Sequence, residues 1–94
     1  MAGETARARF RPGSDTAVEH LGDEVVLIHL KTDRLFVLNR TGARIWELLS
    51  GGHEVTEIEQ RLLGEFETTR EEIAADIGSL LESLQREELI SPDD

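Results

Sequence analysis

The sequence predicts one α+β domain of the winged helix-turn-helix-like type, a three-stranded antiparallel meander followed by three helices. The hydrophobic period changes from about two to about 3.6 residues between Asn39 and Thr41, which indicates a passage from strands to helices. Further along, Thr56 and Thr69 each stand three residues before a glutamate and ahead of an apolar stripe, a pattern typical of helix N-termini. The 94 residues are enough for one domain with a modest core.

Three short runs in the first half of the chain have the composition of β-strands. Residues 16–21 alternate weakly between apolar and polar side chains, and residues 24–30 are rich in β-branched and apolar types, as expected of a buried strand. Gly22-Asp23 is a turn signal between these runs, and residues 31–34 close a hairpin onto a third strand, residues 35–38. A meander of this size cannot bury its apolar face alone, so the segments that follow must cover it.

The remainder of the chain shows the apolar spacing of three amphipathic helices. The first is predicted from Thr41 to Ser50, where Gly51-Gly52 stops it. The second begins at Thr56 and the third at Thr69, each through a capping box, and the third ends near residues 88–90. The second and third helices are shaped like a helix-turn-helix pair. The predicted apolar stripes are Ile45, Trp46, Leu48 and Leu49, then Ile58, Leu62, Leu63 and Phe66, then Ile73, Ile77, Leu80, Leu81 and Leu84.

The folded domain is expected to span residues 16–90, with a mobile N-terminal tail at 1–15 and a short acidic C-terminal tail at 91–94. The N-terminal segment contains arginines but no apolar core, unlike a signal peptide, and no apolar run approaches the roughly 20 residues that span a bilayer. The chain contains no cysteine, so it offers neither a disulfide framework nor a thiolate metal site. This composition favours a cytoplasmic monomer with no membrane partner.

Charge is distributed unevenly along the sequence. Residues 1–53 carry seven acids and seven bases, whereas residues 54–94 carry thirteen acids and three bases, so the net charge of −10 resides in the C-terminal half. Such a surface repels nucleic acid and favours basic partners. A winged-helix DNA-binding transcription regulator is the alternative function that the fold suggests, and its recognition helix would be the third helix. Between Thr69 and Ile90 that helix holds six acids and two bases, so no nucleic-acid partner is predicted.

No arrangement of side chains suggests catalysis, a bound metal or a cofactor. His20, His29 and His53 lack a second ligand at metal-binding spacing, and they are predicted to face solvent or the rim of the core. Glu71-Glu72 lies in the first turn of a helix, where negative charge complements the helix dipole. Trp46, the only tryptophan, is expected to anchor the core. These observations predict a binding protein and not an enzyme.

The run from Leu38 to Leu49 carries a specific motif, L-N-R-T-G-A-R-I-W-E-L-L. It resembles the LN-x-TG-x-x-IW-x-LL signature of the PqqD-like family, the peptide-recognition domains of ribosomally made peptide natural products. The resemblance extends from about residue 24 to residue 90 and includes Ala75-Asp76-Ile77. Family members include the pyrroloquinoline quinone (PQQ) chaperone and the stand-alone recognition proteins of lasso-peptide clusters. The resemblance implies a winged-helix-like fold, no catalytic activity and no cofactor.

The same resemblance implies how a ligand would bind. In the family, a precursor leader peptide adds as a strand beside the third strand and lies in the groove between that strand and the third helix. The end strand of a meander has an open edge that such β-augmentation can use. Several of the helix residues must fill the core instead, and the sequence leaves open which ones. The implied peptide-binding residues are Arg34, Leu35, Phe36, Val37 and Leu38 on the strand, and Ile73, Asp76, Ile77, Leu80, Leu81 and Leu84 on the helix.

Three functions are compatible with the sequence. The first is a non-catalytic adaptor that captures the leader and delivers the precursor to a separate modifying enzyme or leader peptidase, for which it needs a second surface. The second is the transcription regulator described above, and the third is a structural interaction module without a peptide ligand. Lasso-cluster members often have aromatic residues at both places held here by Leu35 and Phe36, so the class of peptide, lasso or PQQ-like, stays open.

Overall fold

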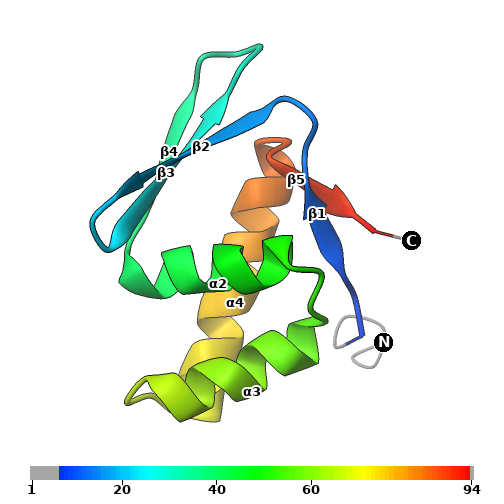
Figure 1. Cartoon of the computed structure of the whole chain (residues 1–94). Helices are drawn as coiled ribbons and strands as arrows, with labels where there is room; N and C mark the ends of the chain where they lie inside the picture. Colours follow the sequence, from blue (N-terminus) through cyan, green and yellow to red (C-terminus); the bar gives the residue numbers. More distant parts are fainter. Residues whose placement is uncertain (1–6, 94) are drawn as a thin grey trace.

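Two antiparallel sheets and a cluster of helices make up the molecule, which is described by a computed structural model over residues 7–93 (Figure 1). Strands β2, β3 and β4 form the larger sheet in that order, and the helices pack below it in Figure 1. The predicted α+β fold, a three-stranded meander followed by three helices, is confirmed within these residues. The elements are β1 (Phe10–Pro12), β2 (Thr16–Leu21), β3 (Glu24–His29), β4 (Leu35–Leu38), α2 (Arg40–Ser50), α3 (Val55–Glu65), α4 (Arg70–Arg86) and β5 (Ile90–Pro92).

Two strands of the larger sheet, β3 and β4, alternate between a more buried and a more exposed face. Val25, Leu27 and His29 of β3 are buried, whereas Val26 and Ile28 between them are partly exposed. The antiparallel register carries this alternation onto β4, because directly paired residues share a face, whereas no residue of β2 is buried. The helices therefore cover one face of β3 and β4, and the other face is open to solvent.

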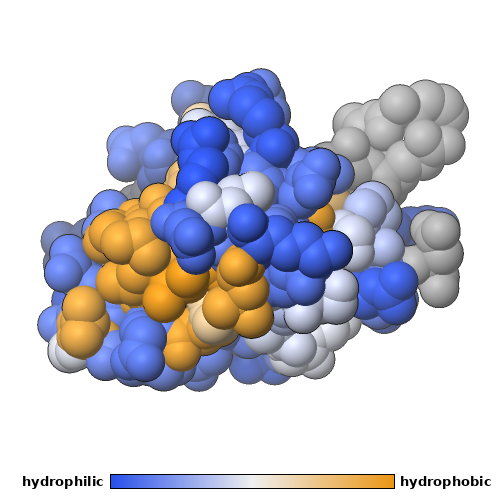
Figure 2. Space-filling view, turned by 90° about the horizontal axis from the view of Figure 1, so that it is seen from above, coloured by the Kyte–Doolittle hydropathy of each residue, from blue (hydrophilic) through white to orange (hydrophobic). Residues whose placement is uncertain are grey.

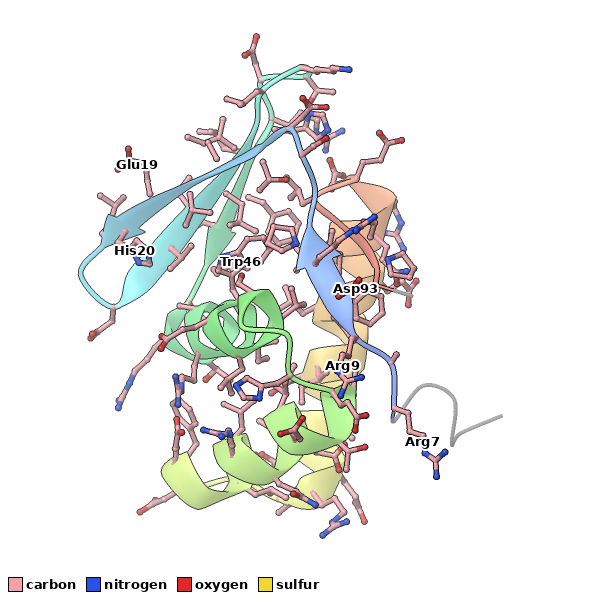
Figure 3. The ribbon with its side chains drawn as sticks, turned by 45° about the vertical axis from the view of Figure 1, so that its right-hand side comes forward. Arg7, Arg9, Glu19, His20, Trp46 and Asp93 are labelled. Atoms are coloured by element: carbon pink, nitrogen blue, oxygen red, sulfur yellow. The ribbon has the colours of Figure 1, made fainter. Side chains whose placement is uncertain are left out.

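The core lies between the covered face of the sheet and the apolar stripes of the helices. Trp46 of α2 is only 4% exposed and lies beneath the sheet (Figure 3), as expected of a core anchor. The buried apolar residues are Val25, Leu27, Leu38, Ile45, Trp46, Leu48, Leu49, Val55, Ile58, Leu62, Ile73, Ile77, Leu81, Leu84, Leu89 and Ile90.

The caps at Asn39 and Thr69 fix where α2 and α4 begin. The Asn39 side chain accepts a backbone N–H of the first turn of α2 at 2.9 Å, and the Thr69 hydroxyl accepts one of α4 at 3.1 Å. The predicted switch from strand to helix at Asn39 is confirmed, and so is the N-terminus of the third helix. The predicted end at residues 88–90 is wrong, because α4 ends at Arg86 and Glu88 adopts a left-handed φ of 59° that no helix contains.

The capping box predicted at Thr56 is also wrong, because α3 begins at Val55. Glu54 takes the N-cap position, and the Glu57 carboxylate accepts its backbone N–H at 3.2 Å. Starting the helix at Val55 buries that side chain, which is 7% exposed, against the core. A pair of glutamates therefore forms the box that the sequence assigned to a threonine and a glutamate.

The two ends of the chain pair with each other, which corrects the prediction of two tails. β1 lies within the expected N-terminal tail and β5 overlaps the expected C-terminal one, yet Phe10 pairs with Pro92 and Pro12 with Ile90 (Figure 1). Strands of three residues are too short to show alternation, and the partners are distant in sequence, so local patterns could not reveal them. Residues 1–6 and 94 of the expected tails lie outside the described residues.

Contacts with neighbouring segments hold this strand pair against the helices. The backbone N–H of Gly13 donates to the Leu89 carbonyl at 2.8 Å. Arg9, just before β1, reaches the loop that precedes α3 (Figure 3), where its Nε donates to the Gly52 carbonyl at 3.1 Å and its guanidinium lies 3.3 Å from the Glu54 carboxylate. Both ends of the described chain are therefore fixed to the helical layer.

Candidate functional site

A groove of about 480 Å³ runs along the free edge of β4, between this strand and α4. Phe36, Val37 and Leu38 line it from the strand, and Asp76 and Leu80 line it from the helix. All five were expected to bind peptide. The structure therefore brings the two predicted walls together around one groove.

β4 is an edge strand, and its outer edge pairs with no other strand in the described part of the chain. On its inner edge, the N–H of His29 donates to the Arg34 carbonyl at 3.0 Å, so hydrogen-bonded pairs recur at every second residue of this ladder. Leu35 and Val37 therefore direct their main-chain N–H and C=O groups away from β3. Their side chains are 65% and 59% exposed. This edge offers unpaired donors and acceptors to an extended chain.

Four helix residues that were expected at the groove lie in the core instead. Ile73, Ile77, Leu81 and Leu84 are each at most 5% exposed, and none of them lines the groove. Their spacing of three or four residues puts them on one face of α4, the face that packs against the core. Leu80 lies beside this face, is partly exposed, and forms the apolar wall of the groove.

Two strand residues that were expected at the groove lie outside its lining. Arg34 forms an ion pair with Glu87, in which Nε lies 3.0 Å from Oε1, and this pair joins the β3–β4 turn to the end of α4. Leu35 pairs with Ile28 and presents its side chain to the solvent-facing side of the sheet. Its main-chain groups nevertheless belong to the open edge of β4.

Other residues that line the groove were missed by the sequence reasoning. On α4, Ser79 and Ser83 follow Asp76 and Leu80 by three residues each, so the helical period could have identified them. Glu24 reaches the groove through the register of β3 on β4, which no local pattern reveals. The missed residues are Glu24, Asn39, Thr41, Gly42, Ile45, Ser79 and Ser83.

A second hollow, of about 450 Å³, lies between the β2–β3 turn, α2 and the end of α3. Arg44 donates to the Glu65 carboxylate at 2.8 and 2.9 Å and to Glu47 at 2.8 Å. The hydrogen bond from Arg44 is the main cause that holds the pKa of the Glu65 carboxyl below its ordinary value. The Arg40 guanidinium lies 5.4 Å from the centre of the Phe66 ring. These contacts join α2 to α3, which gives the hollow a structural role.

The histidines form no reactive or metal-binding arrangement. His29 is 5% exposed, which corrects the prediction that it faces solvent or the rim, and its Nδ1 accepts the N–H of Lys31 at 3.3 Å. His53 lies 3.4 Å from Glu57 on the surface. Over residues 7–93, no three histidine, aspartate or glutamate side chains are placed to hold a metal. In the same range, no helix is long and apolar enough to cross a membrane.

The solvent-facing side of the larger sheet carries several exposed apolar side chains beside Glu19 and Glu24, which pair with Val26 and Leu21. We call this side the outer apolar face. Leu21, Leu35 and Val37 on it are 58%, 65% and 59% exposed. The register pairs Leu35 with Ile28 and Val37 with Val26, which places these residues on the same side. Figure 2 shows apolar side chains gathered into one patch on the side of the molecule where the sheet lies. A contiguous exposed apolar patch on a small protein is typical of an interaction surface.

The chain is similar to known proteins in both sequence and structure. The family model of coenzyme PQQ synthesis protein D (PqqD) matches residues 24–90. The structure of TbiB1 in complex with the TbiA(beta) leader peptide superposes with a TM-score of 0.81 at 33% identity, over 86% of this chain and 94% of that chain. The structure of lasso peptide synthetase B1 complexed with the leader peptide superposes with a TM-score of 0.82 at 29% identity, over 90% and 100%. No curated protein sequence shows significant similarity to the chain. Because the family model spans most of its length, this chain belongs to the PqqD family.

Proposed function

We propose that this chain is a non-catalytic adaptor that binds the leader of a ribosomally synthesised precursor peptide by strand addition. The free edge of β4 beside the groove carries the proposal. An extended peptide can pair with the outward main-chain groups of Leu35 and Val37 while its side chains enter the groove. Two solved relatives of similar fold are complexes with leader peptides, which supports the same class of ligand here.

The dimensions of β4 limit the segment that is bound. The strand runs from Leu35 to Leu38, and a strand rises about 3.3 Å per residue, so it pairs with about four or five peptide residues. Alternate side chains of that segment point to opposite sides of the sheet. One set lies against Phe36 and Leu80 in the groove, and the other set joins the outer apolar face. We therefore expect the leader to carry apolar residues at alternate positions.

Lasso precursors are the peptide class that we propose. The similarity to lasso peptide synthetase B1, over 90% of the chain, favours a lasso leader over the PQQ-type peptide that the family description suggests. In the strand, Leu35 faces outward and Phe36 faces the groove, so Phe36 is the aromatic side chain that meets the leader.

An adaptor also needs a surface for the enzyme that acts on the peptide, and we assign the outer apolar face to it. Val37 belongs both to this face and to the groove, so the two surfaces are continuous. Outward side chains of a bound leader would extend the face beside β4. The modifying enzyme or leader peptidase of the same pathway would then contact the adaptor and the leader together, and recognition would depend on both.

Titration of the chain with leader peptides tests the proposal. The probe is the TbiA(beta) leader labelled with a fluorophore, and a scrambled leader of the same composition is the control. We expect saturable binding of the leader, with amide NMR shifts concentrated in β4 and on the groove side of α4. Shifts confined to the hollow between α2 and α3, or equal affinity for the scrambled peptide, would contradict the proposal.

A further inference from the structure

The charged side chains that line the groove all have the same sign. Glu24, the first residue of β3, and Asp76, in the middle of α4, both line it. No lysine, arginine or histidine of the described residues does so, and the rest of the lining is apolar or uncharged. A peptide in the groove therefore meets two carboxylates and no cation.

Neither carboxylate is paired with a cation of the protein. The ion pairs within residues 7–93 involve other acidic residues, and neither Glu24 nor Asp76 takes part in one. A bound peptide would remove part of their water, which is unfavourable for a carboxylate unless the peptide supplies a positive charge. The groove therefore discriminates between peptides by charge as well as by shape.

The N-terminus of α2 also opens onto the groove, and its dipole alone would favour an anion. This dipole is equivalent to about half an elementary charge. Asn39 already accepts the N–H of Gly42 at 2.9 Å, so part of the donor capacity of the helix end is used. Two full negative charges outweigh the partial positive charge of the helix end. The balance at this place favours a cation.

Both carboxylates lie at the same end of the groove. The ion pair of Arg34 and Glu87 marks the other end. Asp76 precedes Glu87 by eleven residues, or about 16 Å along a helix, so it lies well away from that end. Glu24 stands next to the residue of β3 that pairs with Leu38. The charge is therefore confined to the Leu38 end.

We propose that the leader recognised by this groove carries a lysine or arginine at the end of its strand that lies beside Leu38, and that Glu24 and Asp76 select for it. The inference rests on the proposed function, because it describes the peptide that the groove holds. The Arg34–Glu87 pair has no net charge, so the opposite end makes no such demand. A basic residue at one end also fixes the register, because a shifted leader moves its cation away from both carboxylates.

Selection of binding peptides tests this inference and does not require that the leader sequence be identified. A displayed library of random short peptides is selected on the native chain and on the double variant Glu24→Gln/Asp76→Asn. The control is the double variant Glu67→Gln/Glu71→Gln, which changes the net charge equally at exposed positions outside the groove. We expect the native chain and the control to enrich lysine or arginine at one position, and the groove variant to lose that enrichment.

Affinities of the best selected peptide complete the test. Replacing its basic residue by glutamine should weaken binding to the native chain about fivefold at low salt, and less at high salt. The same replacement should have no effect on binding to Glu24→Gln/Asp76→Asn, which is the coupling that a double-mutant cycle measures.

The outcomes separate this inference from the proposed function. Selected peptides that bind in the groove without an enriched basic residue, or whose basic residue matters equally to the groove variant, overturn the inference and leave the proposed function intact. If Val37→Glu weakens the binding of none of the selected peptides, the peptides bind outside the groove, and both proposals fail. Circular dichroism of each variant checks that it is folded before its peptide binding is compared with that of the native chain.

Discussion

Arg34 and Glu87 connect the two sides of the groove, because their ion pair, with Nε and Oε1 3.0 Å apart, joins the β3–β4 turn to the end of α4. Within residues 7–93, no other ion pair joins the strand side of the groove to the helix side. The Arg34 side chain is 68% exposed, so the pair contributes at most about 1 kcal/mol to stability.

Removal of the arginine should therefore have a small effect on folding and on binding. We expect Arg34→Ala to lower the free energy of unfolding by less than about 1 kcal/mol and the affinity for the leader by no more than about fivefold, because the cost of holding the groove without the pair is of that size. Urea denaturation and fluorescence anisotropy measure the two quantities. Lys31→Ala is the matched control, because Lys31 pairs with Asp15 on the surface, 3.6 Å apart, away from α4. Equal effects of both variants on leader affinity would show that the pair does not set the groove.

Charge introduced on the groove walls should block binding and preserve the fold. Val37 is 59% exposed, so Val37→Glu leaves the core intact. Leu80 is partly exposed and packs against the edge of the core, so Leu80→Asp should cost less stability than a substitution within the core. A carboxylate placed against an apolar peptide side chain should reduce affinity about 10²-fold, or roughly 2.7 kcal/mol. Anisotropy titrations measure this loss.

The neighbouring residue Leu81 provides the contrast. It is 5% exposed and belongs to the core, so Leu81→Asp should unfold the protein or lower its stability by several kcal/mol, about 3 or more. Thermal unfolding followed by circular dichroism compares the three variants. Normal leader binding by both Val37→Glu and Leu80→Asp would mean that the groove is misplaced.

The sequence predicted those parts of the fold that depend on local patterns. The switch from strand to helix at Asn39 follows from the hydrophobic period and is confirmed. Of the apolar stripe predicted on the third helix, Ile73, Ile77, Leu81 and Leu84 are buried, and Leu80 is partly exposed. The start of α3 was missed by one residue, because threonine is a common cap and glutamate at position 54 is a less usual one. The pairing of β1 with β5 depends on a contact between distant residues, which no local pattern encodes.

The division of α4 between core and groove could not be predicted for a physical reason. Leucine and isoleucine serve both surfaces, and the boundary depends on how the helix is rotated about its axis against the sheet. The structure places Leu80 at the groove and Leu81 in the core, although they are adjacent and identical. The place of Glu24 at the groove could not be predicted either. It follows from the pairing of the next residue, Val25, with Leu38, and not from the neighbours of Glu24 in sequence.

Substitution on the outer apolar face should separate leader capture from delivery. Leu21 is 58% exposed and lies on β2, which is the opposite edge of the sheet from β4. We expect Leu21→Glu to leave leader affinity within about twofold and to reduce processing of the precursor by the partner enzyme at least tenfold, because a charge in an apolar interface is costly. Gln85→Glu, on the exposed side of α4, is the control. Unchanged processing with Leu21→Glu would remove the face from consideration.

The contact between Arg44 and Glu65 should make stability depend on pH in the acid range. The hydrogen bond from Arg44 lowers the folded-state pKa of Glu65 below its ordinary value of 4.5. A depressed folded pKa contributes stability that is complete above the unfolded pKa and is lost as the pH falls through the folded one. The difference in unfolding free energy between the native chain and Glu65→Gln should therefore be present at neutral pH and shrink as the pH falls below the ordinary pKa of the carboxyl. Glu67→Gln is the control, and a difference that does not change with pH would contradict the assignment.

The hydrogen-bonding pattern of β4 predicts which backbone amides of a bound leader contribute to its affinity. Only Leu35 and Val37 direct main-chain groups to the open edge, so only every second leader amide can donate to the strand. Methylating such an amide removes a donor and adds a steric clash, whereas methylating the next amide affects a group that points away. We expect the first change to weaken binding at least tenfold, or about 1.4 kcal/mol, and the second to have a much smaller effect. Titrations with a series of singly N-methylated leaders should thus give an alternating profile of affinities. A flat profile, or one with a period of three to four residues, would mean that the leader binds as a coil or a helix, and strand addition at Leu35–Leu38 would be wrong.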